Sequence, residues 1–245
     1  MSAGRHRAGP GALLGALGEL VDLALARECG GCGTAGTRWC DACAAELLGT
    51  LLPRELPGDL PADLPVWSVC AYDGVVREAV VAWKDRDRAD LTAPFAGALL
   101  RAAVAASGAL AGAGHPLMVL PAPSSPAARR TRGRQPVREL SRRTAAGLRR
   151  RGVPAQLLPV LRQRRAVADQ AGLGSTERAQ NLAGALWLPR AWRAQLRGRR
   201  CLLVDDVVTT GATLQEAARV LAEAGAGPIA AVTVAATMLR RAAIR

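Results

Sequence analysis

The sequence has few aromatic residues, a single lysine and only two histidines. Phe, Tyr and Trp make up 3% of the 245 residues, whereas apolar residues of all kinds make up 50%. A core is therefore available, but it must be built from small aliphatic side chains. His6 and His115 lie in a tail and in a loop before a predicted strand, so neither is a convincing general base.

Long uninterrupted hydrophobic runs are also lacking. No stretch reaches the roughly 18 apolar residues of a membrane span. Residues 13–26 follow Arg5 and Arg7 and have the length of a signal peptide, but Glu19 and Asp22 interrupt the run at helical spacing. We interpret this segment as an amphipathic helix and expect a cytoplasmic protein with no membrane span.

Positive charge is abundant and unevenly distributed. The net charge is +13, and the segment between Arg129 and Arg165 carries thirteen arginines against one acid, Glu139, which is +12. Such a block is typical of a surface that binds polyanions such as single-stranded nucleic acid, or simply of a solvated helix face. It contains no Phe, Tyr or Trp, so stacking of bases within it is not expected.

Hydrophobic periodicity predicts alternating strands and helices, which implies a mostly parallel sheet covered on both faces. The α/β part accounts for most of the length, with room for a small additional module. Helices are expected at residues 13–26, 44–51, 75–84, 91–110, 137–151 and 214–224. Strands are expected at residues 66–72, 117–121, 156–161, 200–204 and 229–235.

Four cysteines near the N-terminus form two C-x-x-C pairs separated by seven residues: Cys29, Cys32, Cys40 and Cys43. Two such pairs can supply four thiolates to one tetrahedral Zn²⁺, which makes a closed structural site. The alternatives are a pair of disulfides or a redox C-x-x-C, and neither suits a cytoplasmic chain. We expect zinc, with Cys70 and Cys201 as core residues.

The most informative segment spans residues 201–213, CLLVDDVVTTGAT. An apolar strand ends in Asp205 and Asp206, and a short loop then opens a helix. Free amides at a helix N-terminus bind phosphate, and paired carboxylates suit vicinal hydroxyls or hydrated Mg²⁺. Together they predict a ribose 5-phosphate site, although an ordinary strand followed by a helix cap is the simpler alternative. The residues assigned to this site are Asp205, Asp206, Val207, Thr209, Thr210, Gly211, Ala212 and Thr213.

The segment resembles the signature loop of type I phosphoribosyltransferases, which bind phosphoribosyl pyrophosphate (PRPP). That resemblance implies that Asp205 and Asp206 hold the ribose hydroxyls and carry the catalytic role, and that Mg²⁺ accompanies PRPP. A second loop, after the strand at residues 117–121, offers serines and free amides at the same sheet edge. It comprises Pro121, Ala122, Pro123, Ser124 and Ser125.

Nearly the whole chain resembles the ComF family, phosphoribosyltransferase-fold proteins associated with uptake of single-stranded DNA. The similarity rests on the cysteine pairs, Tyr72-Asp73-Gly74 with Arg77 and Lys84, the Pro-x-Pro loop, an Arg-Gly basic loop and the segment from Gln170 to Ala185. It implies a type I phosphoribosyltransferase fold with an N-terminal zinc module. The implied division is a helix plus zinc module at 1–51, a linker at 52–65 and the phosphoribosyltransferase-like domain at 66–245.

The same resemblance assigns the loop at Pro121–Ser125 to pyrophosphate and places Gln170, Arg178 and Asn181 in a lid. Lys84 or Arg178 would neutralise the departing pyrophosphate. The chain departs from the family at Arg134-Gln135-Pro136, where an aromatic residue and an amide are usual, and this leaves the acceptor side undefined. Two hypotheses follow: a PRPP-binding protein that handles single-stranded DNA with competence or recombination partners, or an active transferase with an unidentified nucleobase-like acceptor.

Overall fold

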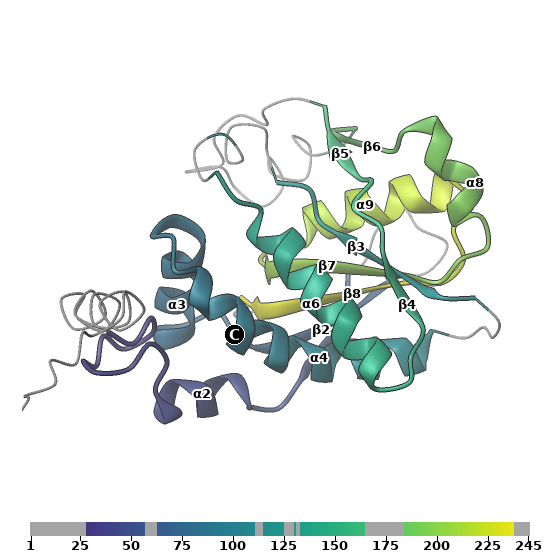
Figure 1. Ribbon diagram of the computed structural model, residues 1–245. Coiled ribbons are helices and arrows are strands. Elements are labelled where there is room, and N and C mark those ends of the chain that lie inside the picture. The colour runs from purple at the N-terminus through teal and green to yellow at the C-terminus, as the bar shows by residue number, and fades with distance from the viewer. Residues whose placement is uncertain are drawn as a thin grey trace, which may run out of the picture.

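A six-stranded sheet organises the molecule (Figure 1). The computed structural model describes residues 28–56, 63–110, 115–124, 130, 133–164 and 184–237. The strand order is β1-β2-β8-β7-β3-β4, and every neighbouring pair is parallel except β1 with β2. The strands are β1 (Leu52–Leu56), β2 (Leu64–Ala71), β3 (Leu117–Pro121), β4 (Ala155–Leu157), β7 (Cys201–Val208) and β8 (Ile229–Ala236).

Helices cover both faces of this sheet, as the alternating pattern predicts. One face packs against α3 (Gly74–Asp85), α4 (Thr92–Ala109) and α6 (Pro136–Arg150), and the other against α9 (Ala212–Glu223). The remaining elements are short: α2 (Asp41–Leu47), η1 (Ala89–Leu91), β5 (Arg162–Gln163), β6 (Leu186–Trp187), η2 (Arg190–Trp192) and α8 (Arg193–Leu196). The mixed α/β fold class is thus confirmed.

Strands β7 and β8 form the centre of the sheet because their sequences are apolar on both faces. Residues 201–204 and 230–235 are fully buried, and most are Leu, Val or Ala. Such continuous apolar runs are typical of parallel strands covered by helices. The one polar pair between β2 and β8, Ser68 and Thr233, is satisfied internally by a 2.7 Å hydrogen bond between the two hydroxyls.

Four expectations differ from the structure. The strand expected at residues 156–161 is the shorter β4, because only residues 155–157 pair with β3, and the helix expected at residues 44–51 is α2, which begins and ends earlier. Residues 52–56, expected to belong to a linker, form strand β1, because their backbone pairs with β2 in antiparallel register from Leu52–Ser68 to Leu56–Leu64. Strand β7, expected to end at Val204, continues through both acids to Val208, because β8 extends beside it as far as Ala236. The predicted helix at 13–26 lies outside the described residues.

One helical stretch, Ala89–Ala109, has the length and hydropathy of a membrane span, and half of that window is buried. It contains α4, which packs against β2, β8 and α6 and contributes Phe95, Leu99 and Ala102 to the core. This packing is that of the core helix of an α/β domain.

The carboxyl ends of the parallel strands meet at one edge of the sheet. Tyr72 follows β2, Ala122 follows β3, Thr209 follows β7 and Thr237 follows β8. In open α/β sheets, ligands bind at this edge. The topology therefore brings together the two loops that the sequence singles out, although they are separated by about 80 residues of chain.

Candidate functional site

A cavity of about 350 Å³ lies at the carboxyl edge of the sheet. Its walls come from five separate parts of the chain: Tyr72 after β2, Lys84 on α3, the loop after β3, the start of α6, and the end of β7 with the start of α9. The lining residues that the sequence analysis predicted are Lys84, Ala122, Pro123, Ser124, Asp205, Asp206, Val207, Thr209 and Thr213. Residues predicted from distant motifs thus share one cavity.

Asp205 and Asp206 both line the cavity, although neighbouring residues of a regular strand point to opposite faces. Local hydrogen bonds fix their carboxylates. The amide of Asp206 donates to Oδ1 of Asp205 at 2.9 Å, and the amide of Val207 donates to Oδ1 of Asp206 at 2.6 Å. Each carboxylate thereby keeps its second oxygen for another partner.

Lys84 reaches the cavity from α3 and forms an ion pair with Oδ2 of Asp206. The Asp206 side chain is only 6% exposed, so an unpaired negative charge there would be costly. The Lys84 ammonium therefore compensates the charge of Asp206 in addition to facing the cavity. The helical spacing of residues 75–84 predicted the helix but not this contact.

Asp205 differs from its neighbour in its electrostatic surroundings. Burial raises the pKa of Asp205 to about 6, and the nearby positive charge of Lys84 limits the rise. An acid with a raised pKa holds its proton more readily, so the ionised form that binds hydroxyls or a cation is complete only above about pH 6.

The loop from Thr209 to Thr213 depends on Gly211. Its φ is 85°, in the left-handed region, and it immediately precedes the first turn of α9. A Cβ at this position would lie 2.5 Å from Cδ1 of Leu56, on strand β1. Glycine is required here both by the backbone conformation and by the close approach of β1. The contact with Leu56 was not predicted, because residues 52–65 were expected to form a linker.

Two hydrogen bonds, one to a side-chain hydroxyl and one between backbone groups, define the shape of this loop. The hydroxyl of Thr210 accepts a hydrogen bond from the amide of Ala212 at 3.4 Å. On the outer side, the amide of Thr237 donates to the carbonyl of Val208 at 2.9 Å. The first amides of α9 have no partner within the helix and lie at the cavity end of that helix, so the arrangement fits an anion.

Some predicted residues do not line this cavity. Thr210, Gly211 and Ala212 shape the loop instead, and Pro121 lines a neighbouring cavity. Ser125, Gln170, Arg178 and Asn181 lie outside the described residues. In the other direction, the structure adds Tyr72, Pro136 and Val137 to the lining, none of which the sequence assigned to the site.

The four cysteines form a second candidate site. Their sulfur atoms all lie within 4.8 Å of one another, and Sγ of Cys40 is 3.6 Å from both Cys29 and Cys32. Zn–S bonds of about 2.3 Å in a tetrahedron separate the sulfurs by about 3.8 Å, so the cluster fits one metal ion. All four cysteines are free thiols, which excludes the pair of disulfides in this structure.

Backbone amides point at these sulfurs. The amide of Cys40 donates to Sγ of Cys29 and the amide of Cys43 donates to Sγ of Cys40, both at 3.5 Å. Burial acts to raise the pKa of Cys29, but backbone hydrogen bonds from Cys32 and Cys40 outweigh it and lower the pKa to about 6. Burial, followed by hydrogen bonding with Cys40, raises the pKa of Cys43 above its usual range. A cation is needed to ionise all four thiols together.

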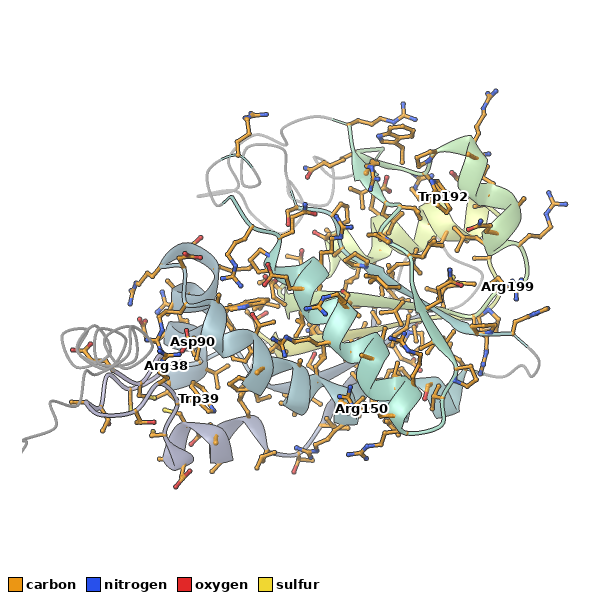
Figure 2. All side chains as sticks on the ribbon, in the orientation of Figure 1. Arg38, Trp39, Asp90, Arg150, Trp192 and Arg199 are labelled. Carbon is orange, nitrogen blue, oxygen red and sulfur yellow. The ribbon has the colours of Figure 1, made fainter. Side chains whose placement is uncertain are left out.

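The cysteine segment is attached to the α/β body by packing and by one arginine. Trp39 makes an edge contact with Phe95 of α4, with ring centroids 6.2 Å apart. Arg88 donates to the carbonyls of Glu28 and Arg38 and is held by Asp90. Figure 2 shows Arg38, Trp39 and Asp90 gathered where this segment meets the helices. The cysteine segment is therefore in direct contact with the helices of the core.

Comparison with known proteins identifies the class of the domain that supplies the β7 and α9 side of the cavity. Residues 132–245 match the family model described as the phosphoribosyl transferase domain. The matched region includes β7, the threonine loop and α9, and it begins just before α6. The chain therefore carries a phosphoribosyltransferase domain, as the sequence motif predicted, together with a four-cysteine cluster that can hold a metal ion.

A more particular similarity covers a short segment. Over 40 residues the chain is 58% identical to the adenine phosphoribosyltransferase of Nocardia farcinica (strain IFM 10152). The matched segment is 16% of this chain and 21% of that protein. The chain thus spans about a fifth of the length of this curated relative.

Proposed function

We propose that this protein binds PRPP in the cavity at the carboxyl edge of the sheet and belongs to the ComF type of phosphoribosyltransferase-fold proteins. The observation that carries the proposal is the convergence of Asp205, Asp206, the Thr209–Thr213 loop, the loop after β3 and Lys84 on one cavity. The phosphoribosyl transferase domain match supports it independently.

Each part of the cavity suits one part of PRPP. The first amides of α9 and the hydroxyls of Thr209 and Thr213 would hold the 5-phosphate, where the helix dipole also favours negative charge. The carboxylate oxygens of Asp205 and Asp206 would accept hydrogen bonds from the ribose hydroxyls. In the loop after β3, Ser124 lines the cavity and would offer its hydroxyl and amide to the pyrophosphate. The amide of Ala122 is already bound to the carbonyl of Val204, and the two prolines of the loop carry no N–H.

If transfer occurs, pyrophosphate leaves the anomeric carbon of the ribose as an acceptor bonds to it. Positive charge develops on the ribose ring, and the two carboxylates lie where they stabilise that charge. Lys84, which also lines the cavity, would offer a positive charge to the departing pyrophosphate. The protein would act mainly by positioning the reactants and stabilising charge.

Two metal ions fit this proposal. Mg²⁺ would arrive with PRPP and neutralise part of its pyrophosphate charge, beside the carboxylates of Asp205 and Asp206. Zn²⁺ would be held by Cys29, Cys32, Cys40 and Cys43 in a structural role, since a site with four protein ligands leaves no position for substrate.

A calorimetric titration with Mg²⁺ and PRPP tests the binding proposal. The wild-type protein should bind, and the double variant Asp205→Asn/Asp206→Asn should bind at least about a hundredfold more weakly, because two charge-assisted interactions are lost. Asp41→Asn, an exposed acid on α2, is the matched control and should bind as the wild type does. Equal binding by all three proteins would refute the assignment.

Transfer activity is tested separately by release of pyrophosphate from PRPP across a panel of nucleobases. The 40-residue similarity to an adenine phosphoribosyltransferase makes adenine the first acceptor to try. Activity that disappears in Asp205→Asn/Asp206→Asn would make the protein an enzyme. PRPP binding with no release for any acceptor would favour the binding-protein form of the proposal.

A role with single-stranded nucleic acid is the second candidate, and the exposed arginines of α6 favour it. Arg142, Arg143 and Arg150 are exposed along this helix, whereas Arg134 is committed to internal contacts with Trp83 and Glu139. The part of the basic block that the structure describes thus combines a solvated face with at least one structural arginine. The resemblance to ComF would place this face in DNA uptake or recombination, beside other competence proteins.

Salt-dependent DNA binding tests this role. Binding of a single-stranded oligonucleotide should weaken steeply as salt rises and should be insensitive to its sequence. The triple variant Arg142→Gln/Arg143→Gln/Arg150→Gln should bind more weakly, with a salt slope reduced by about two. The control variant Arg190→Gln/Arg193→Gln/Arg197→Gln removes the same charge elsewhere on the surface. If its affinity for DNA fell by the same amount, a role specific to α6 would be refuted.

A further inference from the structure

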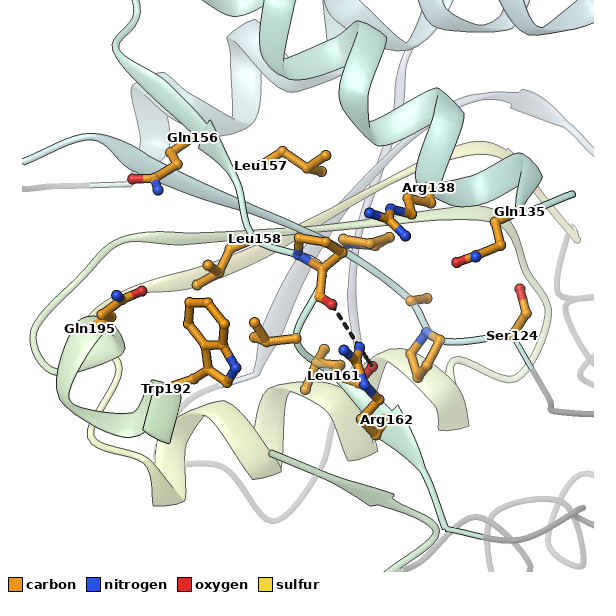
Figure 3. Close-up of a pocket in the computed structure, with 15 residues that line it drawn as sticks. Ser124, Gln135, Arg138, Gln156, Leu157, Leu158, Leu161, Arg162, Trp192 and Gln195 are labelled. Atoms are coloured by element: carbon orange, nitrogen blue, oxygen red, sulfur yellow. Dashed lines mark hydrogen bonds between the residues drawn. The ribbon is translucent and has the colours of Figure 1, made fainter. Parts of the chain in front are cut away.

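A second and larger cavity, of about 660 Å³, lies on the β4 side of the loop after β3. It shares Ala122, Pro123 and Ser124 with the PRPP cavity, but the rest of its wall comes from the segment 156–162, the start of α6 and the η2–α8 turn. Figure 3 shows the cavity with its lining residues. None of the phosphoribosyltransferase motifs other than the shared loop contributes to it.

Positive charge lines this cavity, and no Asp or Glu stands among its lining residues in the described part of the chain. Arg138 enters from α6, and Arg162 from β5. The Arg162 guanidinium is fixed in place, since its Nη1 donates to the carbonyls of Pro159 at 2.7 Å and Leu161 at 3.2 Å. An arginine held in this way loses little entropy when it binds an anion.

The N-terminus of α6 adds to this positive potential. Helix α6 is 15 residues long and begins beside the cavity, with Gln135 as its N-cap residue and Pro136 in the first turn. Gln135 makes no capping hydrogen bond with its side chain, so the amides of Val137 and Arg138 keep their donors for another group. A phosphate at this end would meet the helix dipole and two guanidinium groups together.

The other end of the cavity is suited to a flat aromatic group. Trp192 is half-buried and packs against the apolar cluster beneath α9, so its ring is held rigidly. In Figure 3 Trp192 lies at the opposite end from Gln135 and Ser124, with the amide side chains of Gln156 and Gln195 on the same side as its ring. A glutamine side-chain amide can both donate hydrogen bonds to the edge of a nucleobase and accept them from it.

We propose that this second cavity binds a nucleoside monophosphate, with the phosphate between Arg138, Arg162 and the start of α6 and the base against Trp192. The cavity volume is in the range that holds ligands of this size. The assignment does not depend on PRPP binding, because Asp205, Asp206 and the threonine loop do not line this cavity.

Calorimetry with AMP tests the proposal, with inorganic phosphate and adenosine titrated separately. AMP should bind more tightly than either part alone, because both ends of the cavity contribute. Arg138→Gln and Arg162→Gln should each weaken AMP binding by about tenfold. Trp192→Leu should weaken it by about tenfold while leaving phosphate binding unchanged.

Two further variants locate the bound nucleotide. Arg143→Gln, an exposed residue of α6 that does not line the cavity, should bind AMP as the wild type does. Asp205→Asn/Asp206→Asn should also retain AMP binding. Thermal unfolding of each variant shows whether it remains folded. Arg138→Gln and Arg162→Gln change exposed residues, so these variants should unfold at the same temperature as the wild type.

Several results would overturn the proposal. These are the absence of AMP binding at millimolar concentration, equal affinity for AMP and inorganic phosphate, or insensitivity of AMP binding to Arg138, Arg162 and Trp192. Loss of AMP binding in Asp205→Asn/Asp206→Asn alone would place the nucleotide in the PRPP cavity and also overturn it. The last result would leave the PRPP proposal standing, so the two claims fail separately.

Discussion

The cysteine cluster and the PRPP cavity are both formed by short loops, but they are assembled in opposite ways. Four cysteines within 15 residues bring their sulfur atoms to within 4.8 Å of one another with few contributions from elsewhere. The cavity takes its walls from residues between Tyr72 and Thr213, which only the order of strands brings together. The first site is local in sequence, and the second exists only in the folded sheet.

This difference determines what damages each site. We expect the cluster to depend on its ligands and on a bound metal ion, since a segment of this size cannot build its own core. The cavity depends on charge compensation and on close packing between elements that are distant in sequence, such as Lys84 with Asp206 and Gly211 with Leu56.

Removal of one zinc ligand should have the largest effect on stability. Cys43→Ser should abolish binding of one Zn²⁺ per chain and lower the free energy of unfolding by about 5 kcal/mol, because metal binding is part of the folding energy of the module. Metal analysis and urea unfolding measure the two quantities. Cys70→Ala, a buried cysteine outside the cluster, should retain the zinc; loss of zinc in both variants would break the contrast.

Loss of the Lys84 ammonium should have the next largest effect on the free energy of unfolding. Lys84→Met leaves Asp206 with an uncompensated charge at a nearly buried position and should cost about 3 kcal/mol of unfolding free energy. Urea unfolding is the measurement. The double variant Lys84→Met/Asp206→Asn should recover most of the loss, since the charge is then absent. A double variant no more stable than Lys84→Met would show that the ion pair is not the reason.

Crowding at Gly211 should have a smaller effect on the free energy of unfolding. Gly211→Ala places a Cβ against Leu56 and holds alanine at positive φ. It should therefore lower the free energy of unfolding by about 2 kcal/mol. Adding Leu56→Ala removes the crowding but leaves the backbone strain. PRPP affinity, measured by calorimetry, should therefore recover only in part in the double variant relative to Gly211→Ala. Full recovery would mean that the backbone conformation of Gly211 does not matter.

The raised pKa of Asp205 should have the smallest effect, on the pH dependence of stability and of PRPP affinity. Because the folded pKa of about 6 lies above the ordinary 3.8, the contribution of Asp205 to stability is present at low pH and is lost as pH rises through 6. Mg²⁺–PRPP needs the ionised form, so affinity should fall by about tenfold for each pH unit below 6. Asp205→Asn should be more stable than the wild type near neutral pH and should lack that pH dependence. An unchanged pH profile in the variant would assign the titration to another group.

Sequence reasoning reached the fold class and both candidate sites because their signals are local. The strand at residues 117–121 was predicted with its observed bounds, and the helix at 75–84 differs from α3 by one residue at each end. The spacing of the cysteines indicates a metal site, and the order of acids, threonines and glycine in residues 201–213 indicates a phosphate and ribose site.

The features that sequence reasoning missed arise from contacts between distant segments. The four prolines and three acids of residues 52–65 predict a linker, and only pairing with β2 makes residues 52–56 the strand β1. The ion pair between Lys84 and Asp206 joins α3 to β7, and the wall formed by Tyr72, Pro136 and Val137 depends on the strand order. The second cavity is of the same kind, since no single motif contains Arg138, Arg162 and Trp192.

The most direct test of the central claim is a crystal structure of the protein with Mg²⁺ and PRPP. We predict the 5-phosphate at the amides of Thr209–Thr213, the ribose hydroxyls on Asp205 and Asp206, and pyrophosphate beside Ala122–Ser124 and Lys84. PRPP bound away from the carboxyl edge of the sheet, or a cavity left empty at saturating PRPP, would contradict the account.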